Sequence, residues 1–244
     1  TTAGPEAYGL ASGGAGSSLT AENVAVLTGG ENGYGALAEK GGKIAIQGGK
    51  ITTTGLQASG IALRNPDSAV ETQDVSIQTS GDYASGVGVT LGSGATIRGG
   101  AIATTGVESH GLTSSVAGSL LNAQDVDIKT GGENAYGTYA IKGTTAAING
   151  GNINTTGQGG VGVAIRDSGT SVDVSDLTIA TSGEVAYGGG ALDGGKATVT
   201  GGTIITHGKE GHGVGAGDAG SSAVVKQVSI ETSGEMARGA NVSN

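Results

Sequence analysis

Short runs of alternating aliphatic and polar residues recur along the whole chain at an almost constant interval. The motif Ile-x-Thr-x-Gly, once with valine in first place, begins at Val26, Ile51, Ile77, Ile102, Ile128, Ile153, Ile179, Ile204 and Ile230. Successive motifs are alternately 25 and 26 residues apart. Such alternation predicts short β-strands, and the glycines predict the turns between them. Three runs per repeat predict an all-β parallel β-helix (solenoid) with roughly nine to ten coils, one segment over 1–244.

Several positions within the repeat are nearly constant when the aliphatic residue of the motif is numbered zero. Position 2 is threonine, positions 4 and 9 are glycine, and position 7 is small. We expect positions 0, 2 and 10 to point inward, with each threonine pairing with the threonines of the coils above and below. We expect the constant glycines to occupy corners with a positive φ, which glycine adopts without a steric penalty.

Position −2 distinguishes alternate coils, so the full repeat is a pair of coils, 51 residues long. Glycine occupies this position at Gly49, Gly100, Gly151 and Gly202, and an aliphatic residue occupies it at Val75, Val126, Leu177 and Val228. Large residues beside small ones allow successive layers of a core to interdigitate. The alternation therefore predicts a core in which bulky and small layers follow one another along the axis.

Composition removes several functional classes. The absence of cysteine excludes disulfides and cysteine-based metal or redox centres. The formal net charge of −9 argues against a nucleic-acid partner, which would require a basic surface. No apolar run is long enough to span a bilayer, so we expect no membrane insertion by this segment. Nothing in the sequence indicates a cofactor or a metal.

The repeat resembles a known family. The segment Ile51-Thr-Thr-Thr-Gly-Leu-Gln-Ala-Ser-Gly-Ile61 is similar to the passenger repeats of pertactin-like autotransporters, which are type V secreted proteins of Gram-negative bacteria. The resemblance implies a right-handed parallel β-helix, exported through the outer membrane to the bacterial cell surface or beyond it. It also implies that 1–244 is a fragment of a longer passenger, without the β-barrel translocator. Members commonly act in adhesion, autoaggregation or virulence.

Position 8 is the first candidate binding surface. We expect its side chains to point outward, because those at position 7 are expected to point inward. Four of the six tyrosines and two of the three histidines occupy it. The candidate binding residues of this stripe are Tyr34, His110, Tyr136, Tyr187 and His212. The alternative is a surface column that covers the corner glycines and has no ligand.

Position 5 gives a second candidate, an acidic edge. Acids occur there in every second coil, at Glu31, Asp82, Glu133, Glu184 and Glu235. Two coils correspond to about 9.6 Å along a solenoid, too far for neighbouring carboxylates to share one calcium ion. The edge could support cation-bridged association, or the spacing could keep like charges apart.

The sequence favours a structural interaction protein that binds a host surface or matrix molecule, or another copy of itself. One alternative is a passive stalk that presents a functional module elsewhere in the full chain. A second alternative is a carbohydrate-active β-helix enzyme, for which Asp125 and Asp127 would lie on one strand face. No repeat-breaking catalytic set accompanies them, so we expect no enzymatic activity. His207 and His212 could approach across a corner, but a zinc site lacks a third ligand.

Two repeat breaks 102 residues apart complete the pattern. Leu63-Arg64-Asn65-Pro66-Asp67 and Ile165-Arg166-Asp167-Ser168 occupy the same place in their coils. Proline and aspartate are typical of turns, so both segments are predicted to be turns between strands.

Overall fold

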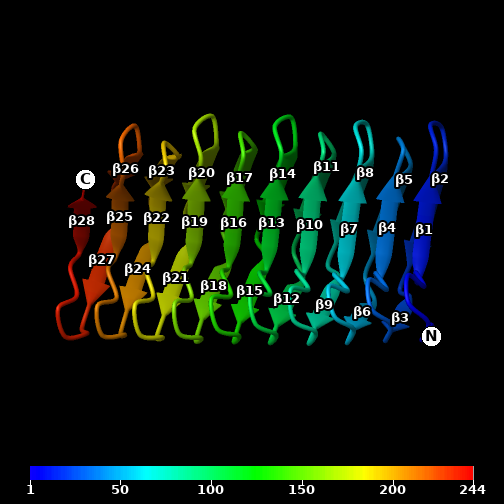
Figure 1. Ribbon diagram of the computed structural model, residues 1–244, viewed down its shortest axis with the longest axis horizontal. Coiled ribbons are helices and arrows are strands. Elements are labelled where there is room, and N and C mark those ends of the chain that lie inside the picture. Colours follow the sequence, from blue (N-terminus) through cyan, green and yellow to red (C-terminus); the bar gives the residue numbers. More distant parts are fainter. Residues whose placement is uncertain (244) are drawn as a thin grey trace.

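A computed structural model describes residues 1–243 as a parallel β-helix in which every coil contributes one strand to each of three sheets. The coils stack side by side along the long axis, and the two ends of the chain lie at opposite ends of the rod (Figure 1). This confirms the all-β solenoid and the three strands per coil that the repeat predicts. Among the described residues, no helix is long and apolar enough to cross a membrane.

The three sheets are named in the order in which the chain enters them. The first sheet contains β1 (Leu10–Gly13), β4 (Ala36–Glu39), β7 (Ile61–Arg64), β10 (Val87–Thr90), β13 (Leu112–Ser115), β16 (Thr138–Ile141), β19 (Val163–Arg166), β22 (Gly189–Leu192), β25 (Val214–Gly217) and β28 (Ala240–Ser243). The second contains β2 (Ser18–Glu22), β5 (Lys43–Gln47), β8 (Ala69–Gln73), β11 (Gly94–Arg98), β14 (Leu120–Gln124), β17 (Thr145–Asn149), β20 (Ser171–Ser175), β23 (Lys196–Thr200) and β26 (Ser222–Lys226). The third contains β3 (Ala25–Thr28), β6 (Lys50–Thr53), β9 (Ser76–Thr79), β12 (Ala101–Thr104), β15 (Asp127–Thr130), β18 (Asn152–Thr155), β21 (Thr178–Thr181), β24 (Thr203–Thr206) and β27 (Ser229–Thr232).

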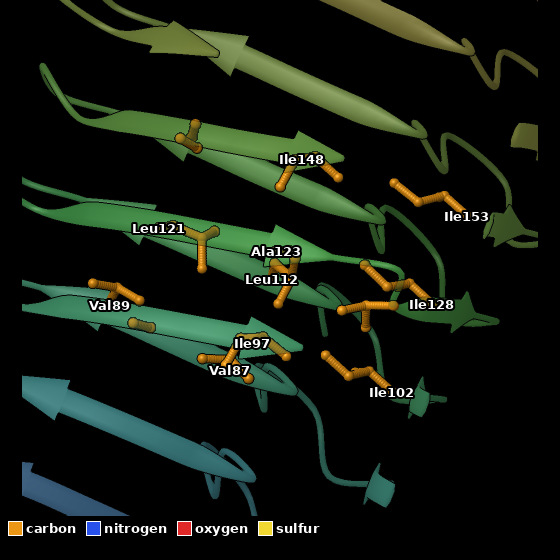
Figure 2. Packing of buried hydrophobic residues seen from close by; sticks show 14 of the residues in the cluster. Val87, Val89, Ile97, Ile102, Leu112, Leu121, Ala123, Ile128, Ile148 and Ile153 are labelled. Carbon is orange, nitrogen blue, oxygen red and sulfur yellow. The ribbon is translucent and has the colours of Figure 1, made fainter. Parts of the chain in front are cut away.

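Strand register places equivalent residues of the repeat directly above one another. Ile102 pairs with Ile77 on one side and with Ile128 on the other. These isoleucines belong to one continuous buried cluster that runs through the rod, and Figure 2 shows how Ile102, Ile128 and Ile153 line up within it. The inward orientation predicted for positions 0, 2 and 10 is confirmed along the interior coils. The core is therefore a set of aliphatic columns.

The alternation at position −2 is also confirmed. Val75, Val126 and Leu177 are buried members of the core cluster. In the coils between them, a Cβ added at Gly100 would lie 2.3 Å from the carbonyl oxygen of Val75. Glycine is thus required in one coil so that the backbone can approach the aliphatic residue of the preceding coil.

The position-2 threonines are buried but do not pair with one another as predicted. Most of their hydroxyls instead donate a hydrogen bond to the position-7 carbonyl of the same coil, for example Thr28 to Gly33 at 2.7 Å and Thr130 to Ala135 at 3.0 Å, whereas the buried hydroxyl of Thr53 has no partner among the described residues. Eight threonines make this bond: Thr2, Thr28, Thr79, Thr104, Thr130, Thr155, Thr181 and Thr206. The threonine column therefore closes the corner within most coils, because its hydroxyl satisfies a buried carbonyl oxygen.

The prediction that the constant glycines have a positive φ is wrong. No glycine at position 4 or 9 has a positive φ. A Cβ at Gly132 would lie 1.8 Å from the oxygen of Gly106, and one at Gly137 would lie 2.3 Å from Cγ2 of Ile153. Close contact between adjacent coils thus excludes side chains at these positions. The left-handed conformation occurs two residues after position 4, where most coils carry a non-glycine residue such as Asn32 (φ 51°) or Asn134 (φ 51°).

Candidate functional site

The side chains at position 8 form a column along the outer side of the first sheet. The position-8 column consists of Tyr8, Tyr34, Ser59, Ser85, His110, Tyr136, Val161, Tyr187, His212 and Arg238. Rings in adjacent coils stack nearly parallel: Tyr8 on Tyr34 with centroids 5.6 Å apart, His110 on Tyr136 at 4.8 Å, and Tyr187 on His212 at 5.0 Å. The spacing follows from the separation of stacked parallel strands, about 4.8 Å, which matches the preferred distance between aromatic rings.

The column lies outside the main core, as predicted, but three of its rings are not free at the surface. Tyr34 is 6% exposed, His110 9% and His212 8%, while Tyr136 and Tyr187 are half-buried. Tyr34 packs in a small cluster of its own with Leu37 and Ala62 on the outer face of the first sheet. The rings cover one another and the sheet, so only ring edges and the ends of each stack remain available for contact.

Two histidines of the position-8 column accept hydrogen bonds from backbone amides of the next coil. Nδ1 of His110 accepts a hydrogen bond from the Tyr136 amide at 3.0 Å, and Nδ1 of His212 accepts one from the Arg238 amide at 3.1 Å. Burial lowers the pKa of His110 to about 4. The pKa of His212 is also lowered, mainly by burial and further by the charge of Arg238. Both rings are therefore neutral at pH 7, as their acceptor role requires.

A cleft of about 340 Å³ opens where valine interrupts the C-terminal part of the column. Val161 is short, so the rings of Tyr136 and Tyr187 border a gap above it. Ala164, Gly190 and Gly215 in the first sheet form a floor with little side chain. The polar groups around the cleft come from Asn134, Tyr136, Arg166, Tyr187, Asn241 and Ser243. No carboxylate side chain of residues 1–243 lines it.

Arg166 is the only charged residue among the described residues that line this C-terminal cleft. Its Nε is buried, and within residues 1–243 it has no hydrogen-bond partner. The neighbouring Tyr139 has a raised pKa, mainly through burial, and the charge of Arg166 acts against that rise. Tyr139 also packs edge-on against Tyr136, with centroids 5.2 Å apart. The cleft thus combines aromatic walls, a floor with little side chain and one guanidinium whose Nε has no partner among the described residues.

A second cleft of about 330 Å³ lies 102 residues earlier in the chain. Its lining repeats that of the C-terminal cleft: Asn32, Tyr34, Ala62, Arg64 and Gly88 correspond to Asn134, Tyr136, Ala164, Arg166 and Gly190. In this N-terminal cleft the guanidinium of Arg64 lies over the ring of Tyr34, 4.9 Å from its centroid, and bonds to the Tyr34 hydroxyl. The same repeat thus builds two sites with differently placed arginines.

The acidic edge is exposed in every coil that carries it. Glu31, Asp82, Glu133, Glu184 and Glu235 are all solvent-exposed. Asp82 accepts a hydrogen bond from the amide of Val107 in the next coil at 2.8 Å. No three histidine, cysteine or acidic residues among 1–243 come together as a possible metal site.

The other candidate pairs do not form the arrangements predicted. Asp125 precedes β15 in the left-handed conformation (φ 53°), whereas Asp127 begins that strand, so the two do not share a strand face. His207 bonds to Ser233 across one coil, whereas His212 stacks on Tyr187. The repeat breaks were also predicted imperfectly, because Leu63 and Arg64 end β7 and Ile165 and Arg166 end β19. Only the residues that follow form the turns.

Sequence reasoning found the column but missed the clefts. The signal was the recurrence of Arg64 and Arg166 at the same place in the repeat. Those segments were predicted to be turns, whereas both arginines end strands of the first sheet and line clefts beside the column.

The fold and this outer face define a parallel β-helix with a ladder of stacked side chains on one side. No protein-family model matches the sequence, and no curated protein does so either. Among solved structures, the cryo-EM structure of the Vag8–C1 inhibitor complex is similar with a TM-score of 0.81 and 21% identity over 97% of this chain.

The neighbour in that complex is Vag8, a Bordetella autotransporter passenger. The two chains share a fold, and the similarity covers 59% of the neighbour's chain. A parallel β-helix is the architecture implied by the sequence motif, and the structural similarity supports this fold.

Proposed function

We propose that this chain is part of an autotransporter passenger at the bacterial cell surface, and that it binds a host surface or matrix molecule through the outer face of the first sheet. The position-8 column with its two clefts carries the proposal, because it gathers aromatic and polar side chains along one side of the rod. Rigid aromatic rings contribute strongly to binding because little conformational entropy is lost when they are covered.

The shared fold with Vag8 supports the surface location, and the complex of Vag8 with C1 inhibitor is an example of a passenger of this fold that binds a host protein. Adhesion is the role assigned here, with contacts repeated along the rod adding through avidity. The proposal includes no reaction, so it contrasts with the passive stalk and with the carbohydrate-active enzyme.

Display on a non-adherent laboratory bacterium tests this function. We expect displayed wild-type chain to increase attachment to host cells or matrix, and soluble chain to compete. Replacement of Tyr34, Tyr136 and Tyr187 by alanine should reduce attachment by at least about tenfold. Replacement of the exposed Leu120 and Val224 of the second sheet by alanine is the matched control and should leave it unchanged.

The outcomes separate the alternatives. Attachment that the column variant does not alter would contradict the proposed face. Settling of the bacteria that soluble chain inhibits would indicate self-association. Absence of both attachment and settling would favour the stalk, and turnover of an added polysaccharide would favour the enzyme.

A further inference from the structure

The C-terminal cleft is an interruption in an otherwise regular stack of rings. Tyr136 and Tyr187 are two coils apart, which corresponds to about 9.6 Å along the axis. Val161 stands between them and fills only the part of the gap nearest the backbone, because its side chain ends at the γ carbons. Each tyrosine already stacks on a histidine on its far side, His110 and His212 respectively. Both rings are thus held in place, with the gap between them.

The width of the gap admits a single ring between the two tyrosines. A ring lying midway would be about 4.8 Å from each tyrosine. Stacked aromatic rings elsewhere in the column are 4.8–5.6 Å apart, so the gap has room for one ring, flat or saturated. A saturated sugar ring is thicker, because axial hydrogens project from both faces. Those apolar hydrogens can rest on the tyrosine faces while the equatorial hydroxyls point to the rim.

The rim supplies the polar partners that such a ring needs. Asn134 and the two tyrosines, which carry hydroxyl groups, line the cleft. Arg166 adds a guanidinium whose Nε is buried and unpartnered among the described residues, in a cleft with no carboxylate. An arginine in a cleft that no carboxylate of the described residues lines favours an anionic group in the ligand.

We propose that Tyr136, Tyr187 and Arg166 form a binding site for one ring of an acidic glycan, whose carboxylate or sulfate group pairs with the guanidinium. This site rests on the binding function proposed above and names its ligand class. The corresponding N-terminal cleft lacks the second wall, because Ser85 stands where Tyr187 would be, and Arg64 lies on Tyr34 instead. Glycan binding is therefore assigned to the C-terminal cleft alone.

Calorimetric titration of the chain with three octasaccharides tests the site. The probes are a heparin fragment with carboxylates and sulfates, a hyaluronan fragment with carboxylates only, and a neutral maltooctaose. We expect an acidic probe to bind and the neutral one to bind at least about tenfold more weakly. Binding of hyaluronan shows that a carboxylate suffices, and binding of heparin alone shows that sulfate is needed. Either result supports the site.

Two variants locate the binding. Val161→Tyr would fill the gap with a ring at the spacing of the ladder, and we expect it to abolish binding while circular dichroism and the melting temperature are maintained. Arg166→Gln should weaken binding of the acidic probe by at least about tenfold and leave neutral maltooctaose unaffected. Leu120→Tyr adds the same ring to the second sheet as a matched control and should change nothing.

Three results would overturn the site: absence of binding by both acidic probes, equal binding of maltooctaose, or unchanged binding in Val161→Tyr. These results are distinguishable from failure of the proposed function. A displayed chain that attaches to host cells in both wild-type and Val161→Tyr forms would retain the adhesive role and lose the glycan site. A chain that attaches to nothing would lose the adhesive role itself.

Discussion

The N-terminal and C-terminal clefts come from the same stretch of the repeat, yet the arginine of one lies on the neighbouring tyrosine ring and that of the other has a buried Nε without a partner among the described residues. Arg64 and Arg166 both end strands of the first sheet. Arg64 finds an aromatic face and a hydroxyl on Tyr34, whereas Nε of Arg166 is without a partner in residues 1–243. The surrounding differences are few. At position 8 the N-terminal cleft has Ser59 and Ser85 where the C-terminal cleft has Val161 and Tyr187. A solenoid can thus keep its backbone constant while a few outer side chains change a site.

The strongest test of this comparison addresses the scaffold that both clefts share. Gly60 and Gly162 are equivalent glycines, and a Cβ on either would lie about 2.3 Å from an isoleucine Cγ2 or a backbone oxygen of the next coil. We expect Gly60→Ala and Gly162→Ala each to destabilise the fold by more than about 4 kcal/mol, because the coils must move apart.

Denaturant unfolding followed by circular dichroism measures this loss. Gly94→Ala is the matched control, because an added Cβ there meets nothing within 4 Å. It should be neutral or stabilise the fold by up to about 1 kcal/mol. Similar stability of Gly162→Ala and Gly94→Ala would show that contact between coils is not the reason for the constant glycines.

Acidification should affect the C-terminal cleft more than the N-terminal one. The pKa of His110 falls to about 4 in the folded chain, against an ordinary value of 6.5. The unfolded chain therefore binds more protons between these values, and stability is complete above pH 6.5 and decreases as the pH falls toward 4. The loss is on the order of 3 kcal/mol, with little further change from this group at lower pH.

The imidazole ring of His110 stacks on Tyr136, which forms a wall of the C-terminal cleft. Hydrogen exchange of the Tyr136 amide, measured between pH 7 and 4, should therefore report the loosening. His110→Phe should remove this pH dependence while costing about 1–3 kcal/mol at pH 7, because the Tyr136 amide loses its acceptor. The exposed His207→Phe is the control. An unaltered pH profile in His110→Phe would contradict this assignment.

Removal of the two arginines should have unequal effects on stability. Arg64→Ala loses the contact with the Tyr34 ring and the bond to its hydroxyl, and we expect a loss of about 1 kcal/mol. Arg166→Ala should be neutral or slightly stabilising, since it removes a buried Nε that lacks a partner. Thermal melting of the two variants compares them directly, and equal losses would show that the arginines are placed alike.

The smallest effect is expected at the acidic edge. Glu133 and Glu184 each directly precede a residue that lines the C-terminal cleft. Their replacement by glutamine should change stability by less than about 0.5 kcal/mol, because both are exposed. The corresponding change of Glu31 and Asp82 beside the N-terminal cleft tests the same point. Added calcium should not alter the melting temperature of either form. A rise in melting temperature with calcium would support cation-bridged association through the acidic edge.

Sequence periodicity predicted the coil, the strand register and the inward columns because these depend on residues that repeat. It did not predict why Gly132 or Gly137 is constant, since the reason is the distance to the next coil and not the local conformation. Burial of Tyr34 and His110 was missed for the same reason, because the rings that stack on them, Tyr8 and Tyr136, lie 26 residues away in the chain. Placement of the arginines required knowing which residues face which side of the sheet.

Hydrogen bonds between adjacent coils run along the rod, and this has a mechanical consequence. Tension applied to the two ends of the chain would first break the hydrogen bonds that join a terminal coil to its neighbour, one after another. The interior coils would stay intact. Each coil that peels away would release 25 or 26 residues of extended chain, or about 80 Å of added length. The rod would therefore lengthen in small, regular steps under force, each at low tension, while the remaining coils kept their outer face.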